Sequence, residues 1–591
     1  MGRGRPWRPA QAPRPAGPAG GGTGRAAPAT GGLPGGAAPA AVLRGRIGWL
    51  LRVNRLYAAD DRWTRAATFT AAFAGGSHPG AVSTSKVSRW ENGLVAVERA
   101  AVRRYEEVLA LESGSLLSTV DVITRYLTSA PSAAAAALPS AGPAARAAPP
   151  TAGERRRGEG LLERLDSTDT LTGRDWDEAT AWIVSEPGLR LRRREWDAVC
   201  HRLLVETVAA DGEAWKPRFE AYLRLLNHPG SRMSAIATCG DWAASPGSRV
   251  FIETLSMLDA STHPDAARHV VAQLRAPTNG DALTGALLAT VRKLREHHFT
   301  AEQRDAVTDA VLDVLADPAR RGDPAYPLAA AALRLLPPEV SGRLSARLRQ
   351  GGAAPRGGPG GASRASAPGG LPRPDTDARS GGAGQGATGR LHPLITARST
   401  AMLARELPQF QDLLLPVLVG ELLDAPLSDD RLYAGFLIRA TPYRGPVADT
   451  LVWELARQRP ALAPARTVRL LEALRVVGTP AERPFVEALA ARQGLPGAVQ
   501  SAAVQALGHM GGASAAGRWQ TLLARHTAAA TAGAGSRAAE DVLHHAVYSL
   551  AIGRHTAVLG GLAATHPLAS VRASARWWLD LPTHMYVSAA H

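Results

Sequence analysis

The chain has 591 residues and a net charge of +16, and 45% of its residues are hydrophobic whereas only 5% are aromatic. This length allows about three or four domains. The abundance of alanine favours packed helices over sheets, because alanine is the best helix former and a poor strand former. No run of about 18 apolar residues occurs, and the basic start lacks the apolar core of a signal peptide. We therefore expect an all-α protein in the cytoplasm, with no membrane partner.

Cysteine usage and the absence of catalytic motifs limit the chemistry that we expect. Cys200 and Cys239 are the two cysteines of the chain, which favours a reducing compartment and argues against a disulfide scaffold or a cysteine-based zinc site. The sequence contains no phosphate-binding G-x-x-x-x-G-K-[ST] loop, no H-E-x-x-H and no G-x-S-x-G. We expect no enzymatic activity, no cofactor and no bound metal.

Positive charge is concentrated at the N-terminal end of the chain. Nine arginines and no acidic residue precede Asp60. Residues 1–128 hold 17 basic and 8 acidic residues, whereas residues 151–350 hold 27 and 28. A general preference for arginine over lysine does not explain this absence of acids. The distribution predicts a nucleic-acid-binding head on a more neutral body.

Segments rich in glycine, proline and alanine divide the chain, and such segments bury too little apolar surface to fold. The basic arm at the N-terminus can add phosphate or minor-groove contacts, or it can be a simple tail or a mis-assigned start. The predicted divisions are a disordered basic arm over 1–41, a compact helical head over 42–128, an Ala/Pro linker over 129–153, a helical repeat body over 154–350, a Gly-rich disordered linker over 351–390 and a second helical repeat body over 391–591.

Five helices are predicted in the head from apolar spacing and from helix-breaking residues. Ser83 can cap the start of the third helix, and Gly93 stands where a glycine commonly ends one. The run 75–80, Gly-Gly-Ser-His-Pro-Gly, separates the second helix from the third. The predicted helices span 42–56, 63–73, 83–92, 97–111 and 116–127.

The third helix carries the most informative sequence of the chain, S-T-S-K-V-S-R-W-E-N-G over 83–93. Helical spacing turns Val87 and Trp90 toward the interior. The small polar and basic side chains that remain are expected to point outward, and they are Thr84, Ser85, Ser88 and Arg89.

Small polar residues and an arginine at the start of an exposed helix suit the major groove of DNA. Arg89 can donate two hydrogen bonds to guanine, and Thr84 and Ser85 can contact base edges or the thymine methyl group. Lys86 suits a phosphate better than a base.

The segment 88–93, Ser-Arg-Trp-Glu-Asn-Gly, resembles the end of the recognition helix in the lambda-repressor-like, Cro-type (XRE) helix-turn-helix family. Residues 47–52 resemble the first helix of that family, and the whole resemblance covers roughly 43–117. It implies a helix-turn-helix DNA-binding domain over 42–128 with double-stranded DNA as its partner. Members of the family commonly dimerise on two half-sites, which implies a homodimer. The connection 74–82 is longer than the three- or four-residue turn of the family.

The resemblance also implies roles for single residues. Thr84, Ser85 and Arg89 correspond by position to the residues that read bases. Ser83 and the loop at Asn92 correspond to positions that meet the phosphate backbone. The predicted DNA-binding residues are Ser83, Thr84, Ser85, Lys86, Ser88, Arg89 and Asn92.

Both bodies show weak internal repetition. His-Pro pairs recur at 228–229, 263–264, 392–393 and 566–567, each with an arginine soon after and an apolar helix following. The sequences around Val499 and Val571 resemble the second helix of HEAT-type repeats. Small alanines let paired helices approach, and each pair buries its apolar side against neighbours, so we expect HEAT-like α-solenoids. Ordinary alanine-rich bundles are the alternative.

These expectations combine into a sequence-specific DNA-binding transcriptional regulator, which would be nucleoid-associated when bound. Its solenoid would receive a protein partner or a signal. Two alternatives stay open. One is a non-enzymatic interaction scaffold with a vestigial or protein-binding head. The other is a solenoid that itself grips nucleic acid, which the near-neutral charge of 151–350 argues against for the first body.

Overall fold

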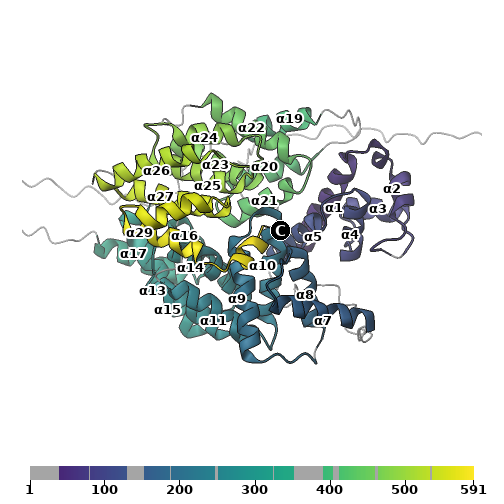
Figure 1. Ribbon diagram of the computed structural model, residues 1–591, viewed down its shortest axis with the longest axis horizontal. Helices are drawn as coiled ribbons and strands as arrows, with labels where there is room; N and C mark the ends of the chain where they lie inside the picture. Colours follow the sequence, from purple (N-terminus) through teal and green to yellow (C-terminus); the bar gives the residue numbers. More distant parts are fainter. Residues whose placement is uncertain are drawn as a thin grey trace, which may run out of the picture. The chain divides into compact units, whose positions relative to one another are not determined.

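The described residues of the computed structural model are 39–78, 80–128, 152–186, 188–245, 251–321, 323, 325–351, 391–403, 412–458, 463–532 and 536–590. Within these ranges the chain forms α-helices and short 3-10 helices but no β-strand, which confirms the all-α prediction (Figure 1). The predicted disorder of the arm and of both linkers falls almost entirely outside the described residues. Among the described helices, none combines the length and the apolar character that crossing a bilayer requires.

The N-terminal helices lie close to the predicted positions. The predicted second helix is divided, because Arg65 adopts an extended conformation between a 3-10 turn and a shorter α-helix. The Asp60 side chain caps that turn by accepting a hydrogen bond of 3.0 Å from the amide of Arg62. The elements are α1 (Pro39–Leu56), η1 (Asp61–Thr64), α2 (Ala66–Phe73), α3 (Thr84–Glu91), α4 (Arg99–Val108) and α5 (Ser115–Thr128).

The middle of the chain, the first body, consists of helices joined by short connections in its described residues. Its elements are α7 (Ala152–Asp166), α8 (Gly173–Ser185), α9 (Arg193–Ala209), α10 (Gly212–Asn227), α11 (Arg232–Ala244), α12 (Phe251–Met257), η2 (Leu258–Ala260), α13 (Pro264–Arg275), α14 (Gly280–Arg295), α15 (Ala301–Ala316), η3 (Pro318–Arg320), α16 (Ala325–Leu335) and α17 (Glu339–Gly351).

The C-terminal part, the second body, follows with the same kind of element. Its helices are α19 (Leu391–Met402), α20 (Leu415–Asp424), α21 (Ser428–Arg439), α22 (Arg444–Arg457), α23 (Pro464–Val477), α24 (Arg483–Ala491), α25 (Gly497–His509), α26 (Ala516–Thr531), α27 (Ser536–Ile552), α28 (Thr556–Thr565), α29 (Ala569–Leu579) and α30 (Thr583–Ser588).

Alternate helices stack on one another in both bodies. In the first body α12, α14 and α16 form one row, and α9, α11, α13, α15 and α17 form another. In the second body α21, α23, α25, α27 and α29 follow one another in the same way. This alternation, with each helix buried against its sequence neighbour and the next helix but one, is the packing of an α-solenoid.

Small residues bring the stacked helices close together, as the sequence suggested. A Cβ atom on Gly508 of α25 would lie 2.9 Å from Oγ of Ser549 on α27. Ala503, five residues earlier on the same helix, is fully buried. The His-Pro pairs mark helix boundaries: His263 caps α13 by accepting a hydrogen bond from the amide of Asp265, and His566 follows the end of α28.

A buried ion-pair cluster joins the two bodies. Arg292 on α14 donates hydrogen bonds of 2.7 and 2.8 Å to the carboxylate of Asp429 on α21. It donates a third, also of 2.7 Å, to Asp259 of η2. All three side chains are buried, and the pKa of Asp429 lies below its usual value because Arg292 outweighs the effect of burial. The cluster fixes the first turn of α21 against the first body.

Replacing Arg292 by methionine should destabilise the protein strongly. The change keeps an extended side chain but leaves two carboxylates buried without their counter-charge, and breaking such a pair costs about 3–5 kcal/mol. Urea unfolding of the full-length chain measures the loss as a lower midpoint. Arg304→Met is the control, because Arg304 is exposed on α15 of the same body. Equal midpoints for the two variants would contradict the structural weight given to this cluster.

Candidate functional site

The helix α3 is held by its buried face and leaves its other face open. Ser83 caps it, because its hydroxyl accepts a hydrogen bond of 3.2 Å from the amide of Lys86. Val87 and Trp90 are 0% and 1% exposed. Trp90 packs against Phe73 of α2, with ring centroids 5.9 Å apart. The inward direction predicted for these two residues is therefore confirmed.

The opposite face of α3 is open to solvent. Thr84, Ser85, Ser88 and Arg89 are all exposed, as the helical spacing predicted. Within the described part of the chain, the Arg89 guanidinium forms no hydrogen bond or ion pair. A cation with no internal partner on an exposed helix face is free to bind an external acceptor.

The remaining predicted DNA-binding residues already have contacts inside the protein. Asn92 donates a hydrogen bond of 2.7 Å to the carbonyl of Ser88 and so closes the end of α3. Arg52 of α1 donates one of 3.5 Å to the Asn92 side chain. The Lys86 ammonium lies 5.0 Å from the centre of the Trp90 ring. These contacts place basic groups at both ends of the exposed face.

Glu91, which belongs to the sequence motif, has a structural role that the sequence did not reveal. Its carboxylate is buried and accepts two hydrogen bonds from Arg55 of α1, of 2.6 and 2.7 Å. The Tyr105 hydroxyl of α4 donates a third of 3.0 Å. Arg55 also donates to the carbonyls of Trp63 and Thr64. This carboxylate therefore fixes α3 against α1 and α4, and Arg55 extends the network to η1.

The end of α3 approaches α1 closely because glycine occupies both sides of the contact. A Cβ atom on Gly48 would lie 2.6 Å from the carbonyl oxygen of Trp90. Gly93 has a φ of +66°, and a Cβ atom there would lie 2.8 Å from the backbone of Gly45. Side chains at either position would push α3 away from α1, so the Gly93 of the motif serves both turn and packing.

The long connection between α2 and α3 is anchored at several points. His78 is buried, packs against Phe73 and Trp90, and its Nδ1 lies 3.0 Å from the carbonyl oxygen of Gly80. Arg104 of α4 donates hydrogen bonds to the carbonyls of residues 72, 73 and 74. Although this connection is longer than the family turn, its contacts fix the start of α3.

The helix α1 lies between α3 and the second body. Asn54 donates a hydrogen bond of 2.8 Å to the carbonyl of Ala440. Arg46 forms an ion pair of 2.6 Å with Glu421 of α20. Trp49 donates from Nε1 to both carboxylate oxygens of Asp412, at 2.9 and 3.0 Å. These contacts lie on a different side of α1 from Gly45 and Gly48, which pack against the end of α3.

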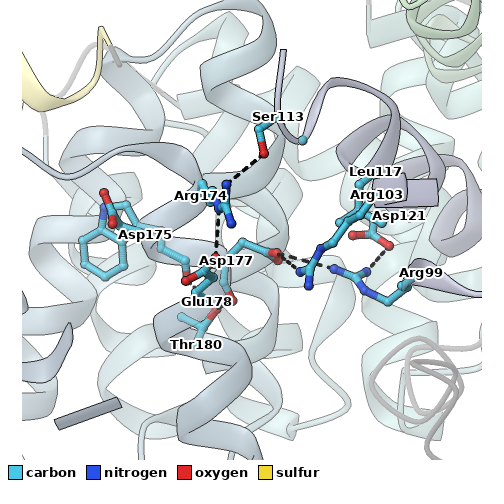
Figure 2. Close-up of polar contacts among 12 residues, drawn as sticks. Arg99, Arg103, Ser113, Leu117, Asp121, Arg174, Asp175, Asp177, Glu178 and Thr180 are labelled. Carbon is cyan, nitrogen blue, oxygen red and sulfur yellow. Dashed lines mark hydrogen bonds and ion pairs between the residues drawn. The ribbon is translucent and has the colours of Figure 1, made fainter. Parts of the chain in front are cut away.

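A second charged cluster attaches α4 and α5 to the first body. Figure 2 shows Arg99 and Arg103 of α4 pointing toward Asp177 of α8, at 3.5 and 3.6 Å. Arg224 of α10 completes the cluster at 2.6 Å. Burial alone would raise the pKa of Asp177, but Arg224 and Arg99 hold it below its usual value.

Asp121 of α5 belongs to the same cluster, but its pKa is raised, whereas that of Asp177 is lowered. It accepts a hydrogen bond from Arg99 (Figure 2). Burial nevertheless raises its pKa to about 6, and the nearby carboxylates of Asp177 and Glu220 act in the same direction. The contact between head and first body therefore includes one carboxyl group that titrates just below neutral pH.

In the part of the chain that the structure describes, no group of three or more histidine, cysteine or acidic residues could hold a metal ion. Both cysteines are free and buried. Burial raises the pKa of the Cys239 thiol to about 12, so this thiol is not activated as a nucleophile.

Comparison with protein-family models, with curated protein sequences and with solved structures finds no match for this chain.

Replacing Glu91 by glutamine should loosen α3. The amide keeps the shape of the side chain but leaves the Arg55 guanidinium buried without a counter-charge, which costs about 3 kcal/mol or more. Hydrogen exchange of the α3 amides in the full-length chain measures the effect as faster opening. Glu98→Gln is the control, since Glu98 is exposed before α4. Unchanged exchange in Glu91→Gln would show that this network does not hold the helix.

The Asp121 carboxyl should give the head a distinctive pH dependence. Its pKa is raised to about 6 in the folded protein, so the folded state holds this proton more tightly than the unfolded state. The resulting stabilisation is complete below about pH 4 and is lost as pH rises through about 6. Compared with Asp121→Asn, wild-type stability should fall by about 3 kcal/mol across this window.

Urea unfolding at a series of pH values tests this expectation. The exposed Asp169 provides the control, because Asp169→Asn should leave the pH dependence of the wild type in place. A constant difference in stability between wild type and Asp121→Asn from pH 4 to 7 would contradict the assignment.

Proposed function

We propose that this protein is a transcriptional regulator that binds a specific double-stranded DNA sequence by placing α3 in the major groove. The observation that carries the proposal is the arrangement of α3: one face is fixed by Val87, Trp90 and Glu91, while the other exposes Arg89 without an internal partner. Sequence reading needs a rigid helix with uncommitted polar groups, and α3 meets both conditions.

Base recognition is assigned to three exposed side chains. Arg89 donates two hydrogen bonds to O6 and N7 of a guanine, which is the commonest specific contact in the major groove. Thr84 and Ser85, in the first turn of α3, contact base edges or a thymine methyl group. This assignment agrees with the positions that the resemblance to the XRE helix-turn-helix family implies.

Phosphate contacts surround this reading face. Lys86 and Ser88 belong to α3, and Ser83 precedes it. Asn92 lies at the end of the helix with Arg52 beside it. Contacts from such groups set the position of the helix on the duplex without reading sequence, and the positive charge of Lys86 and Arg52 makes the binding dependent on salt.

The two bodies would serve as the surface for a protein partner or for a signal. The proposal includes a homodimer on two half-sites, as in the family that the head resembles, and a location in the cytoplasm at the nucleoid. The α-solenoid supports a partner-binding role because stacked helices form extended surfaces.

Replacing Arg89 by alanine should weaken specific DNA binding by about 1–3 kcal/mol and relax the preference at one base pair. The test first selects binding sites for the full-length chain from random duplex DNA at about 0.15 M salt, where nonspecific binding is weak. Fluorescence anisotropy then compares wild type with Arg89→Ala on the best site. Arg304→Ala, an exposed change on α15, should bind like the wild type.

The other outcomes identify the alternatives. An enriched motif that Arg89→Ala binds as tightly and as selectively would make α3 the wrong reading face. Binding that shows no enriched motif and that survives Lys86→Ala and Arg89→Ala would favour a solenoid that grips nucleic acid. The absence of any DNA binding would favour the interaction scaffold.

A further inference from the structure

A cavity of about 160 Å³ lies where the first body meets the second. Its wall combines Asp211, at the start of α10, and Glu253 of α12 with residues of α21, α23, α25 and α27. All of these helices except α12 are labelled in Figure 1. The cavity is distinct from the exposed face of α3, since the two share no residue.

Most polar groups of the wall are already paired. Nδ1 of His509 lies 2.6 Å from the Asp211 carboxylate, and the Tyr548 hydroxyl lies 3.4 Å from Nε2 of the same histidine. Arg439 pairs with Glu213 at 3.1 Å and donates to the carbonyl of Val476 at 2.9 Å. These groups define the polar edge of the cavity without offering a strong unused charge.

Two oppositely charged side chains of the wall, Glu253 and Arg475, are not paired with other side chains of the described residues. Among the described residues, the side chains of Glu253 and Arg475 form no ion pair with each other and no hydrogen bond with another side chain. Burial raises the pKa of Glu253 although Arg475 acts in the opposite direction. Both residues line the same cavity, so a single molecule can reach both.

The rest of the wall is aromatic and apolar. Trp215 stacks on Phe219, with ring centroids 4.4 Å apart and planes 24° apart, and lies 6.0 Å from Phe436. Trp215 is half-buried, so part of the ring faces the cavity. A small apolar group placed there would be removed from water and would gain stabilisation from burial.

We propose that this cavity is a binding site for a free α-amino acid with an apolar side chain. The carboxylate of the ligand pairs with Arg475, its ammonium group pairs with Glu253, and its side chain lies against Trp215 and Phe436. The size suits the apolar side chain of such a ligand, because a cavity of about 150 Å³ is enough to hold benzene. A ligand that carries only one of the two charges would leave the other charge of the wall unpaired.

The helix α21 connects the wall of the cavity with the head. Arg439 and Phe436 belong to α21, whose Tyr433 stacks on Tyr126 of α5 with ring centroids 4.0 Å apart. Use of the bound amino acid as a signal for DNA binding rests on the proposed function. Occupancy of the cavity does not, because it is measured without DNA.

Isothermal titration calorimetry of the full-length chain tests the site with L-phenylalanine and L-leucine as probes. We expect saturable binding of at least one of them at millimolar or lower concentration. Glycine, which lacks the apolar side chain, should bind more weakly. The analogues 3-phenylpropionate and phenethylamine lack the ammonium and the carboxylate, respectively. Each should bind about tenfold more weakly than phenylalanine, or less tightly still.

Variants of the wall and a control outside it complete the test. Arg475→Ala and Glu253→Gln should each weaken binding by about tenfold or more, whereas Arg492→Ala, an exposed change at the end of α24, should not. Arg475 is itself exposed, so its replacement is expected to leave the fold intact. The absence of binding by both amino acids, or binding that neither wall variant weakens, overturns the proposal. Equal affinity for 3-phenylpropionate and phenylalanine overturns the assignment of a zwitterion.

Discussion

The helix α21 is the element on which the other parts of the structure depend, because three separate segments of the chain meet on it. Arg292 of the first body forms an ion pair with Asp429 in the first turn of α21. Tyr433, in its middle, stacks on Tyr126 of the head. Arg439, at its end, pairs with Glu213 at the start of α10. A shift of this one helix would therefore move the head contact and the cavity wall together.

Buried charges give these alanine-rich helices a specific register. Apolar helix faces built from alanine and leucine resemble one another, so burial alone distinguishes poorly between neighbouring registers. A buried carboxylate such as Glu206 is satisfied in only one arrangement, in which Trp176, Arg202 and Arg218 all reach it. Arg218 also donates to the carbonyl of Ser588, which holds the last helix on the first body. Because burying charge is costly, we infer that these buried charges act mainly by excluding misaligned packings.

Local features could be predicted from the sequence, and distant pairings could not. The capping by Ser83, the inward positions of Val87 and Trp90 and the helical bounds follow from spacing over a few residues. The partner of Glu91 is Arg55, 36 residues earlier, and nothing in the spacing of either residue marks it. His509 and Asp211 stand 298 positions apart, so their contact, and the cavity beside it, depend on how the two bodies fold together.

The two sides of α1 explain how the head can be attached to the second body while the outer face of α3 stays exposed. Its glycines receive the end of α3, whereas Trp49 and Asn54 bind the second body. Among the described residues, the attachment therefore uses neither Arg89 nor any other exposed residue of α3. A head fastened through α1, α4 and α5 keeps its open helix face while its orientation is set by the bodies. Any change in the packing of α21 would reach α3 through α1 and α5, without altering the groups on its exposed face.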